Sequence, residues 1–216
     1  MARLKAAVLI SGRGSNLQAL IDACAASDFP AEIAIVVADR DDAPGLERAR
    51  RSDIPVTTVA RAARAGRADF ESALDVVLRA AGAELICLAG FMRVLSAGFV
   101  ESWGDRILNI HPSLLPAFPG LQSHERALEA GVRFSGCTVH FVRAGVDEGP
   151  ILVQAAVPVL TNDTAGSLAE RVLTAEHRLY PLALKLVAEG RARIVGRRVE
   201  IAAPVETASA MLNPSG

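Results

Sequence analysis

The chain has 216 residues, of which 51% are hydrophobic, and its 23 basic and 24 acidic side chains give a formal net charge of -1. This length fits a single domain with a sizeable core. No stretch reaches the roughly 18 uninterrupted apolar residues of a membrane span, and the apolar run near the N-terminus is shorter than the core of a signal peptide. The basic residues are scattered, without the basic stripe of a nucleic-acid-binding protein. We therefore expect a cytoplasmic protein that acts on small molecules, with no nucleic acid and no membrane as partner.

Cysteine and histidine spacing argues against a metal site. The three cysteines lie far apart and form no C-x-x-C pair, which is typical of reduced thiols. The four histidines show no spacing of the kind found in zinc sites. We therefore expect no metal. The histidines are His111, His124, His140 and His177.

The first half of the chain predicts alternating strands and helices. Its continuous apolar runs, rich in Ala, Val and Ile, are typical of buried parallel strands, and the apolar positions after residue 68 recur at the spacing of an amphipathic helix. Such alternation indicates an α/β fold in one domain, with a doubly wound and mostly parallel sheet. The predicted strands cover residues 4–11, 33–38, 56–59, 85–89 and 107–111, and the predicted helices cover residues 15–26, 44–52 and 68–81.

The second half predicts a different order. Two strand-like runs at residues 137–142 and 151–159 have no helix between them, which indicates an antiparallel pair. A long helix follows, opened by Thr164 or Ser167, with Ser167 and Glu170 as a capping box, and Pro181 should kink or interrupt it. A short hairpin is predicted at residues 193–195 and 199–202. We assign residues 1–203 to the single domain and residues 204–216 to a disordered tail.

A glycine turn lies between the first predicted strand and the first predicted helix, at residues 11–16, which read SGRGSN. Glycines allow a sharp turn, and the N-terminus of the following helix offers free N–H groups and the positive end of its dipole, a combination that binds phosphate. The dinucleotide fingerprint would need a third glycine where Leu17 stands. Two interpretations stay open at this point, an anion site and a plain turn between strand and helix.

The stretch ILNIHPSLLPAFPG at residues 107–120 is neutral and rigid. Alternate residues of a strand face the same side, so Asn109 and His111 point together, and Pro112 favours an extended His111. At the carboxyl end of a strand, where open α/β sheets bind ligands, an amide and an imidazole could hold a carbonyl oxygen as it becomes negative. The alternative is a neutral histidine bonded to a loop carbonyl.

A carboxylate between glycines follows in the sequence GVDEGP at residues 145–150. The functional interpretation is a mobile loop that brings the carboxylate to the histidine, to orient and charge it. The alternative is an ordinary hairpin turn.

Four motifs together resemble the phosphoribosylglycinamide formyltransferase family. They are SGRGSNLQAL at residues 11–20, LAGFMRVL at 88–95, NIHPSLLP at 109–116 and VDEGP at 146–150. The resemblance covers about residues 4–190, in order and with ordinary spacing. It implies a formyltransferase-like variant of the Rossmann fold, and a cis bond between Leu115 and Pro116. It also implies transfer of the formyl group of 10-formyltetrahydrofolate, as co-substrate, to the amine of glycinamide ribonucleotide in de novo purine biosynthesis.

The resemblance also assigns roles to residues of this chain. The trio Asn109, His111 and Asp147 would be catalytic. The ribonucleotide would be bound by Gly14, Ser15, Asn16 and Glu176. The folate would be bound by Arg67, Met92, Arg93, Val94, Leu95, Asn109, Arg143, Ala144, Gly145, Val146 and Asp147.

Three positions depart from the family pattern. Arg13 stands where the family commonly has Asn, so its charge could add to phosphate attraction. Ala144 and Gly145 stand where the family often has acidic residues, so contacts through their side chains are not implied, whereas backbone contacts are unaffected.

Two related enzymes and one binding module are the rival interpretations. Methionyl-tRNA formyltransferase shares the trio, but it would need a C-terminal RNA-binding domain, and it usually continues as Arg-Gly-Ala-Ala-Pro where this chain has Ala-Phe-Pro-Gly. A folate hydrolase would carry an N-terminal regulatory domain, whereas the first strand is predicted here from residue 4. A non-catalytic nucleotide-binding module would leave the trio unexplained. We expect a monomer or a weak homodimer.

Overall fold

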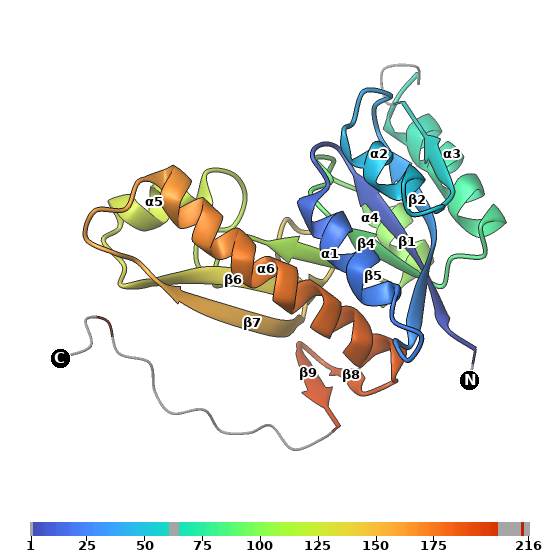
Figure 1. Cartoon of the computed structure of the whole chain (residues 1–216). Helices are drawn as coiled ribbons and strands as arrows, with labels where there is room; N and C mark the ends of the chain where they lie inside the picture. Colours follow the sequence, from blue (N-terminus) through green and yellow to red (C-terminus); the bar gives the residue numbers. More distant parts are fainter. Residues whose placement is uncertain (1, 61–64, 203–212, 214–216) are drawn as a thin grey trace.

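The computed structural model describes residues 2–60, 65–202 and 213. Its main sheet has seven strands in the order β3-β2-β1-β4-β5-β6-β7 (Figure 1). The first five strands pair in parallel, and β6 and β7 are added antiparallel. The α/β fold with a mostly parallel sheet and an antiparallel pair is thereby confirmed. The strands are β1 (Leu4–Ile10), β2 (Ala31–Ala38), β3 (Val56–Thr58), β4 (Leu85–Leu88), β5 (Ile107–His111), β6 (Phe134–Phe141) and β7 (Ile151–Pro158).

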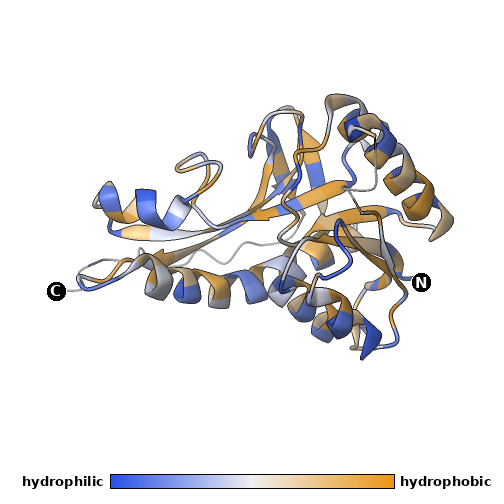
Figure 2. Ribbon diagram, turned by 90° about the horizontal axis from the view of Figure 1, so that it is seen from above, coloured by the Kyte–Doolittle hydropathy of each residue, from blue (hydrophilic) through white to orange (hydrophobic). Residues whose placement is uncertain are grey.

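Helices cover both faces of the parallel part of the sheet (Figure 1). Alternate residues of β1 belong to two separate apolar clusters, so this strand is buried on both sides. Hydrophobic residues accordingly concentrate in the central strands, while hydrophilic residues lie on the outer sides of the helices (Figure 2). The helices are α1 (Ser15–Cys24), α2 (Gly45–Arg50), α3 (Arg67–Ala80), α4 (Ala97–Trp103), α5 (Ser123–Glu129) and α6 (Ala165–Ala188), and a separate hairpin pairs β8 (Ala192–Val195) with β9 (Arg198–Ile201).

Several local predictions need correction. Helices α4 and α5 were not predicted, because each has only seven residues, too few to show a helical repeat. The capping box of α6 joins Thr164 to Ser167 rather than Ser167 to Glu170: the Ser167 backbone N–H donates to the Thr164 hydroxyl, and the Thr164 backbone N–H donates to the Ser167 hydroxyl. Pro181 does not interrupt α6, which continues to Ala188.

Other predictions are confirmed or fall outside the described residues. The bond between Leu115 and Pro116 is cis. The predicted tail at residues 204–216 lies outside the described part of the chain, apart from Asn213. Within residues 2–60 and 65–202, no helix combines the length and the hydrophobicity that crossing a membrane would require.

Tyr180 links the long helix α6 to two neighbouring strands of the sheet, β4 and β5. Its ring is fully buried, and its hydroxyl lies 3.0 Å from the carbonyl oxygen of Leu88 and 3.2 Å from that of Leu108. Leu88 is the last residue of β4, and Leu108, the second residue of β5, directly precedes Asn109. The hydroxyl therefore links the core helix to the strand that carries two of the predicted catalytic residues.

We expect Tyr180→Phe to lower the free energy of unfolding by about 1–2 kcal/mol, because the two buried carbonyls lose the single hydroxyl donor that they share, which water cannot easily replace. Urea unfolding followed by circular dichroism measures this change. Thr174→Ala is the control, because it removes an exposed hydroxyl from the same helix and should cost no more than about 0.5 kcal/mol. A Phe variant as stable as the parent chain would contradict the assignment.

Candidate functional site

A cavity of about 640 Å³ opens at the carboxyl ends of β4 and β5. Its walls are formed by the ends of these strands, by segments 90–95 and 120–125, and by the loop at residues 142–147. Ligands of open α/β sheets bind outside the carboxyl ends of the strands, and the strand order of this sheet reverses between β1 and β4, whose end lines the cavity. The cavity therefore lies where the fold predicts a binding site.

Most residues assigned to the folate line this cavity. Arg67 is the exception: it is exposed at the start of α3 and is not part of the lining. The side chain of Arg93 lies 2.5 Å from the buried carboxylate of Asp39, so this guanidinium already has an ionic partner. The lining residues are Met92, Arg93, Val94, Leu95, Asn109, Arg143, Ala144, Gly145, Val146 and Asp147.

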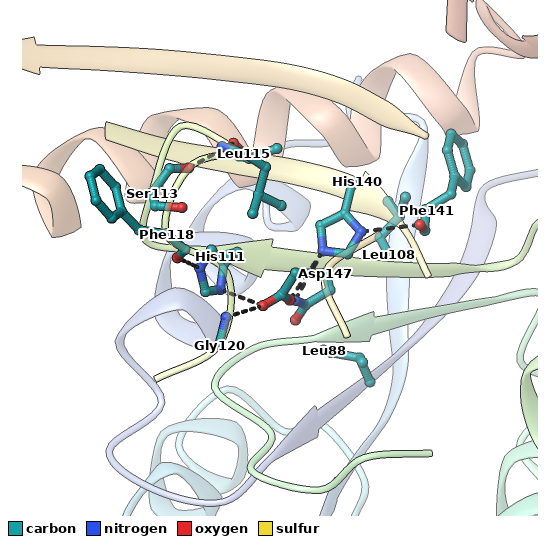
Figure 3. Close-up of polar contacts among 12 residues, drawn as sticks. Leu88, Leu108, His111, Ser113, Leu115, Phe118, Gly120, His140, Phe141 and Asp147 are labelled. Carbon is teal, nitrogen blue, oxygen red and sulfur yellow. Dashed lines mark hydrogen bonds and ion pairs between the residues drawn. The ribbon is translucent and has the colours of Figure 1, made fainter. Parts of the chain in front are cut away.

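The predicted trio meets at the carboxylate of Asp147, and Figure 3 shows this carboxylate beside His111, His140 and Gly120. Its Oδ2 lies 3.2 Å from Nδ1 of His111 and accepts a hydrogen bond of 2.8 Å from the backbone N–H of Gly120. Its Oδ1 lies 3.4 Å from Nδ2 of Asn109. Strand β5 and the loop after β6 thus bring together three side chains that are up to 38 residues apart in sequence.

The ring of His111 has an acceptor at each nitrogen. Nε2 lies 3.0 Å from the carbonyl oxygen of Phe118, and Nδ1 faces Asp147. A carbonyl and a carboxylate only accept hydrogen bonds, so both contacts are complete when the ring carries two protons. The loop-carbonyl contact of the alternative interpretation is therefore present, but it occupies only one of the two nitrogens. The contact of the other nitrogen with Asp147 supports the interpretation in which a carboxylate is brought to this histidine.

His140 is a member of this cluster that the sequence did not indicate. It is directly opposite Asn109 in the antiparallel pairing of β5 and β6. Its Nδ1 lies 3.1 Å from the carbonyl oxygen of Phe141 and donates to it, and its Nε2 lies 3.2 Å from Nδ2 of Asn109. Nε2 also lies 3.7 Å from Oδ1 of Asp147. From the neighbouring strand β6, His140 therefore contacts both the amide of Asn109 and the carboxylate of Asp147.

The protonation of Asp147 reflects two opposed influences. Burial raises its pKa, but the contacts with His140, with the backbone N–H of Gly120 and with His111 outweigh burial and leave the pKa below its ordinary value. The carboxylate is accordingly ionised at neutral pH. Its backbone has φ of 58°, a left-handed conformation that is strained for most residues with a side chain and that is often found at functional sites.

The residues assigned to the ribonucleotide form a second group, at the start of α1. The N-cap residue of α1 is Gly14, which has no side chain to accept a hydrogen bond, so the first turn of α1 lacks a side-chain cap. Nδ2 of Asn16 donates to Oε2 of buried Glu176 over 2.7 Å. Burial raises the pKa of Glu176, and the hydrogen bond from Asn16 offsets part of this effect. A helix N-terminus and a buried carboxylate thus lie side by side.

Within the described ranges, no group of three or more His, Cys, Asp or Glu side chains is placed to hold a metal ion.

Residues 4–184 match the formyl transferase family. The phosphoribosylglycinamide formyltransferase of Escherichia coli is 44% identical over 187 residues, which cover 87% of this chain and 88% of that protein. The trifunctional purine biosynthetic protein adenosine-3 of Homo sapiens is 49% identical over 192 residues, which cover 89% of this chain but only 19% of that protein. The crystal structure of glycinamide ribonucleotide transformylase 1 from Symbiobacterium toebii is 54% identical, covers 92% of this chain and 94% of its own, and has a TM-score of 0.90.

The raised pKa of Glu176 makes stability depend on pH. Between the ordinary pKa of glutamate and the raised value, the folded protein binds more protons than the unfolded one, so the free energy of unfolding should fall as the pH rises. Glu176→Gln removes this loss, and its urea midpoint should change less than that of the parent chain between about pH 5 and about pH 8. Glu170→Gln is the control, because this glutamate is exposed on the same helix. Equal pH dependence of the parent chain and the Glu176 variant would contradict the prediction.

Proposed function

The chain belongs to the formyl transferase family, and on this premise we propose that it transfers the formyl group of 10-formyltetrahydrofolate to the amine of glycinamide ribonucleotide. The products are N-formylglycinamide ribonucleotide and tetrahydrofolate, in de novo purine biosynthesis. The observation that carries the proposal is the meeting of Asn109, His111 and Asp147 in the wall of one cavity. Relatives that match most of both chains are named phosphoribosylglycinamide formyltransferase.

The chemistry of the cavity fits a folate. Apolar side chains such as Phe91, Val94 and Leu95 form part of its lining, as a planar aromatic ring system requires, and the loop at residues 143–147 offers backbone donors and acceptors. Arg67 lies outside the lining and could contact only a part of the folate that extends out of the cavity. When bound, 10-formyltetrahydrofolate supplies the carbon that the amine attacks.

The geometry divides the chemical work among three side chains. His111 and Asn109 would donate hydrogen bonds to the formyl oxygen, where negative charge develops during acyl transfer. Asp147 is ionised and would accept the proton of the attacking amine and pass it, directly or through a water, to the folate nitrogen that leaves as its bond to the formyl carbon breaks. Both donors now have acceptors within the protein, and the longest of these contacts, 3.4 Å from Asn109 to Asp147, would be exchanged most easily for the substrate oxygen.

The start of α1 would hold the phosphate of the ribonucleotide. The backbone N–H groups of Gly14, Ser15 and Asn16 lie at the N-terminus of this helix, where the dipole favours an anion. Glu176 would accept hydrogen bonds from hydroxyl groups of the ribose. We also propose a cytoplasmic monomer or weak homodimer that acts on small molecules without metal, nucleic acid or membrane. The net charge of -1 supports the absence of a nucleic-acid partner.

Incubation of the purified chain with 10-formyltetrahydrofolate and glycinamide ribonucleotide should release tetrahydrofolate and N-formylglycinamide ribonucleotide in equal amounts. Without the ribonucleotide, release should be negligible. Release at the same rate without the ribonucleotide would indicate a hydrolase, and formylation of methionyl-tRNA in its place would indicate the rival transferase.

We expect His111→Ala and Asp147→Asn each to lower kcat by about 10²–10³, with small changes in KM, because each loses an interaction made with developing charge. The double variant should lose much less than the product of the two, because the residues act as one unit. Glu148→Gln, the exposed neighbouring carboxylate, is the control and should retain its kcat. Fully multiplicative losses would show that Asp147 works independently of His111.

A further inference from the structure

Helix α2 packs against the glycine turn with no side chain between the two backbones. A Cβ added to Gly14 would lie 2.8 Å from Cα of Gly45, closer than real Cβ atoms approach another atom. A Cβ added to Gly45 would lie 2.7 Å from Cδ1 of Ile10 and 3.0 Å from the carbonyl oxygen of Gly12. The two glycines therefore allow the start of α2 to touch the turn directly.

Two successive carbonyl groups of the turn are held by α2. The backbone N–H of Gly45 donates to the carbonyl oxygen of Gly12 over 3.0 Å, and Nε of Arg48 donates to the carbonyl oxygen of Arg13 over 2.9 Å. In a trans peptide the carbonyl and the following N–H point in opposite directions. Holding these two carbonyls toward α2 therefore turns the N–H groups of Arg13 and Gly14 away from it.

The N–H groups at this turn remain available to donate hydrogen bonds to a ligand. Among the residues that the structure describes, the backbone N–H groups of residues 13–17 donate to no acceptor, and the first hydrogen bond of α1 is the one from Gln18 to Gly14. Arg48 also contacts this first turn, because its Nη1 lies 3.3 Å from Oε1 of Gln18. One half-buried guanidinium thus joins the turn to the helix whose N-terminus would face the proposed phosphate.

We propose that Arg48 is a positioning residue for the ribonucleotide phosphate: it fixes the peptide between Arg13 and Gly14 so that the N–H of Gly14 points toward the phosphate. This inference rests on the proposed function, which supplies the anion. A donor that is already oriented costs no ordering on binding, so Arg48 acts on affinity for the nucleotide, and it acts through the backbone rather than by touching the substrate.

Steady-state kinetics of Arg48→Met tests the proposal, because methionine fills similar space without a donor. The KM for glycinamide ribonucleotide should rise about tenfold, the change expected for the loss of about 1.4 kcal/mol. The kcat and the KM for the folate should change by less than about twofold, because the catalytic trio is untouched. Arg48→Lys keeps one donor within reach of the Arg13 carbonyl and should restore most of the affinity.

Arg51→Met is the matched control, because it removes a charge from the end of the same helix, where the guanidinium pairs with exposed Glu47. It should leave the KM for the ribonucleotide unchanged. If Arg51→Met raises the KM for the ribonucleotide as much as Arg48→Met does, the effect is one of net charge and the proposal is wrong. If Arg48→Met raises both KM values equally, Arg48 serves only the packing of the domain and the proposal is also wrong.

Titration with inorganic phosphate separates this inference from the formyl transfer. In amide NMR spectra, phosphate should shift the signals of Gly14 and Ser15 in the parent chain, and much less at the same concentration in Arg48→Met. This result would support the role of Arg48 even for a chain that transfers no formyl group. Equal shifts in both proteins, or no shifts in the parent chain, would overturn it. If Arg48→Met does not fold, as judged by circular dichroism, Arg48→Lys carries the same comparison with a smaller expected difference.

Discussion

The carboxylate of Asp147 accepts contacts from three parts of the chain: strand β5 through Asn109 and His111, strand β6 through His140, and the loop before α5 through the backbone N–H of Gly120. A buried carboxylate is costly unless it is paired and hydrogen-bonded. Asp147 meets this condition only when the loop at residues 143–147 lies across the end of the sheet. The position of this loop therefore determines both the shape of the cavity wall and the stability of the charged carboxylate in it.

This network also limits how the donors can be used. Asn109 and His111 have protein acceptors in this structure, so a substrate oxygen must replace one of them rather than fill an empty position. Such a replacement leaves no buried polar group unpaired as long as the displaced acceptor keeps its other contacts. Asp147 does so, because Gly120 and His111 still donate to it when Asn109 turns away. The site can thus exchange a weak internal contact for one with developing charge at little cost.

The sequence predicted the succession of strands along the chain and the shared side of Asn109 and His111, because both follow from local patterns, whereas the other site residues were assigned by the family resemblance. Apolar runs indicate buried strands, and the alternation of a strand gives Asn109 and His111 the same side. The position of His140 depends on which residue of β6 pairs with Asn109, and this register is set by packing across the sheet rather than by a local pattern. Helices α4 and α5 were missed for a related reason: each is one short segment stabilised by tertiary contacts, as when the buried carboxylate of Glu71 accepts from the backbone N–H of Ser96 at the start of α4.

The ends of β1 and β4 connect the two proposed substrate sites. The backbone N–H of Ser11 donates to the carbonyl oxygen of Gly90, and its hydroxyl accepts from the backbone N–H of Met92 over 2.9 Å. Ser11 begins the glycine turn, and residues 90–95 form a wall of the cavity. The turn that would hold the phosphate is thus fastened to the segment that would hold the folate. Holding two reactants at a fixed distance and orientation removes much of the entropy cost of a bimolecular step. For the proposed transfer between two separate substrates, this rigid connection between their sites would add to the contribution of the three proposed catalytic side chains.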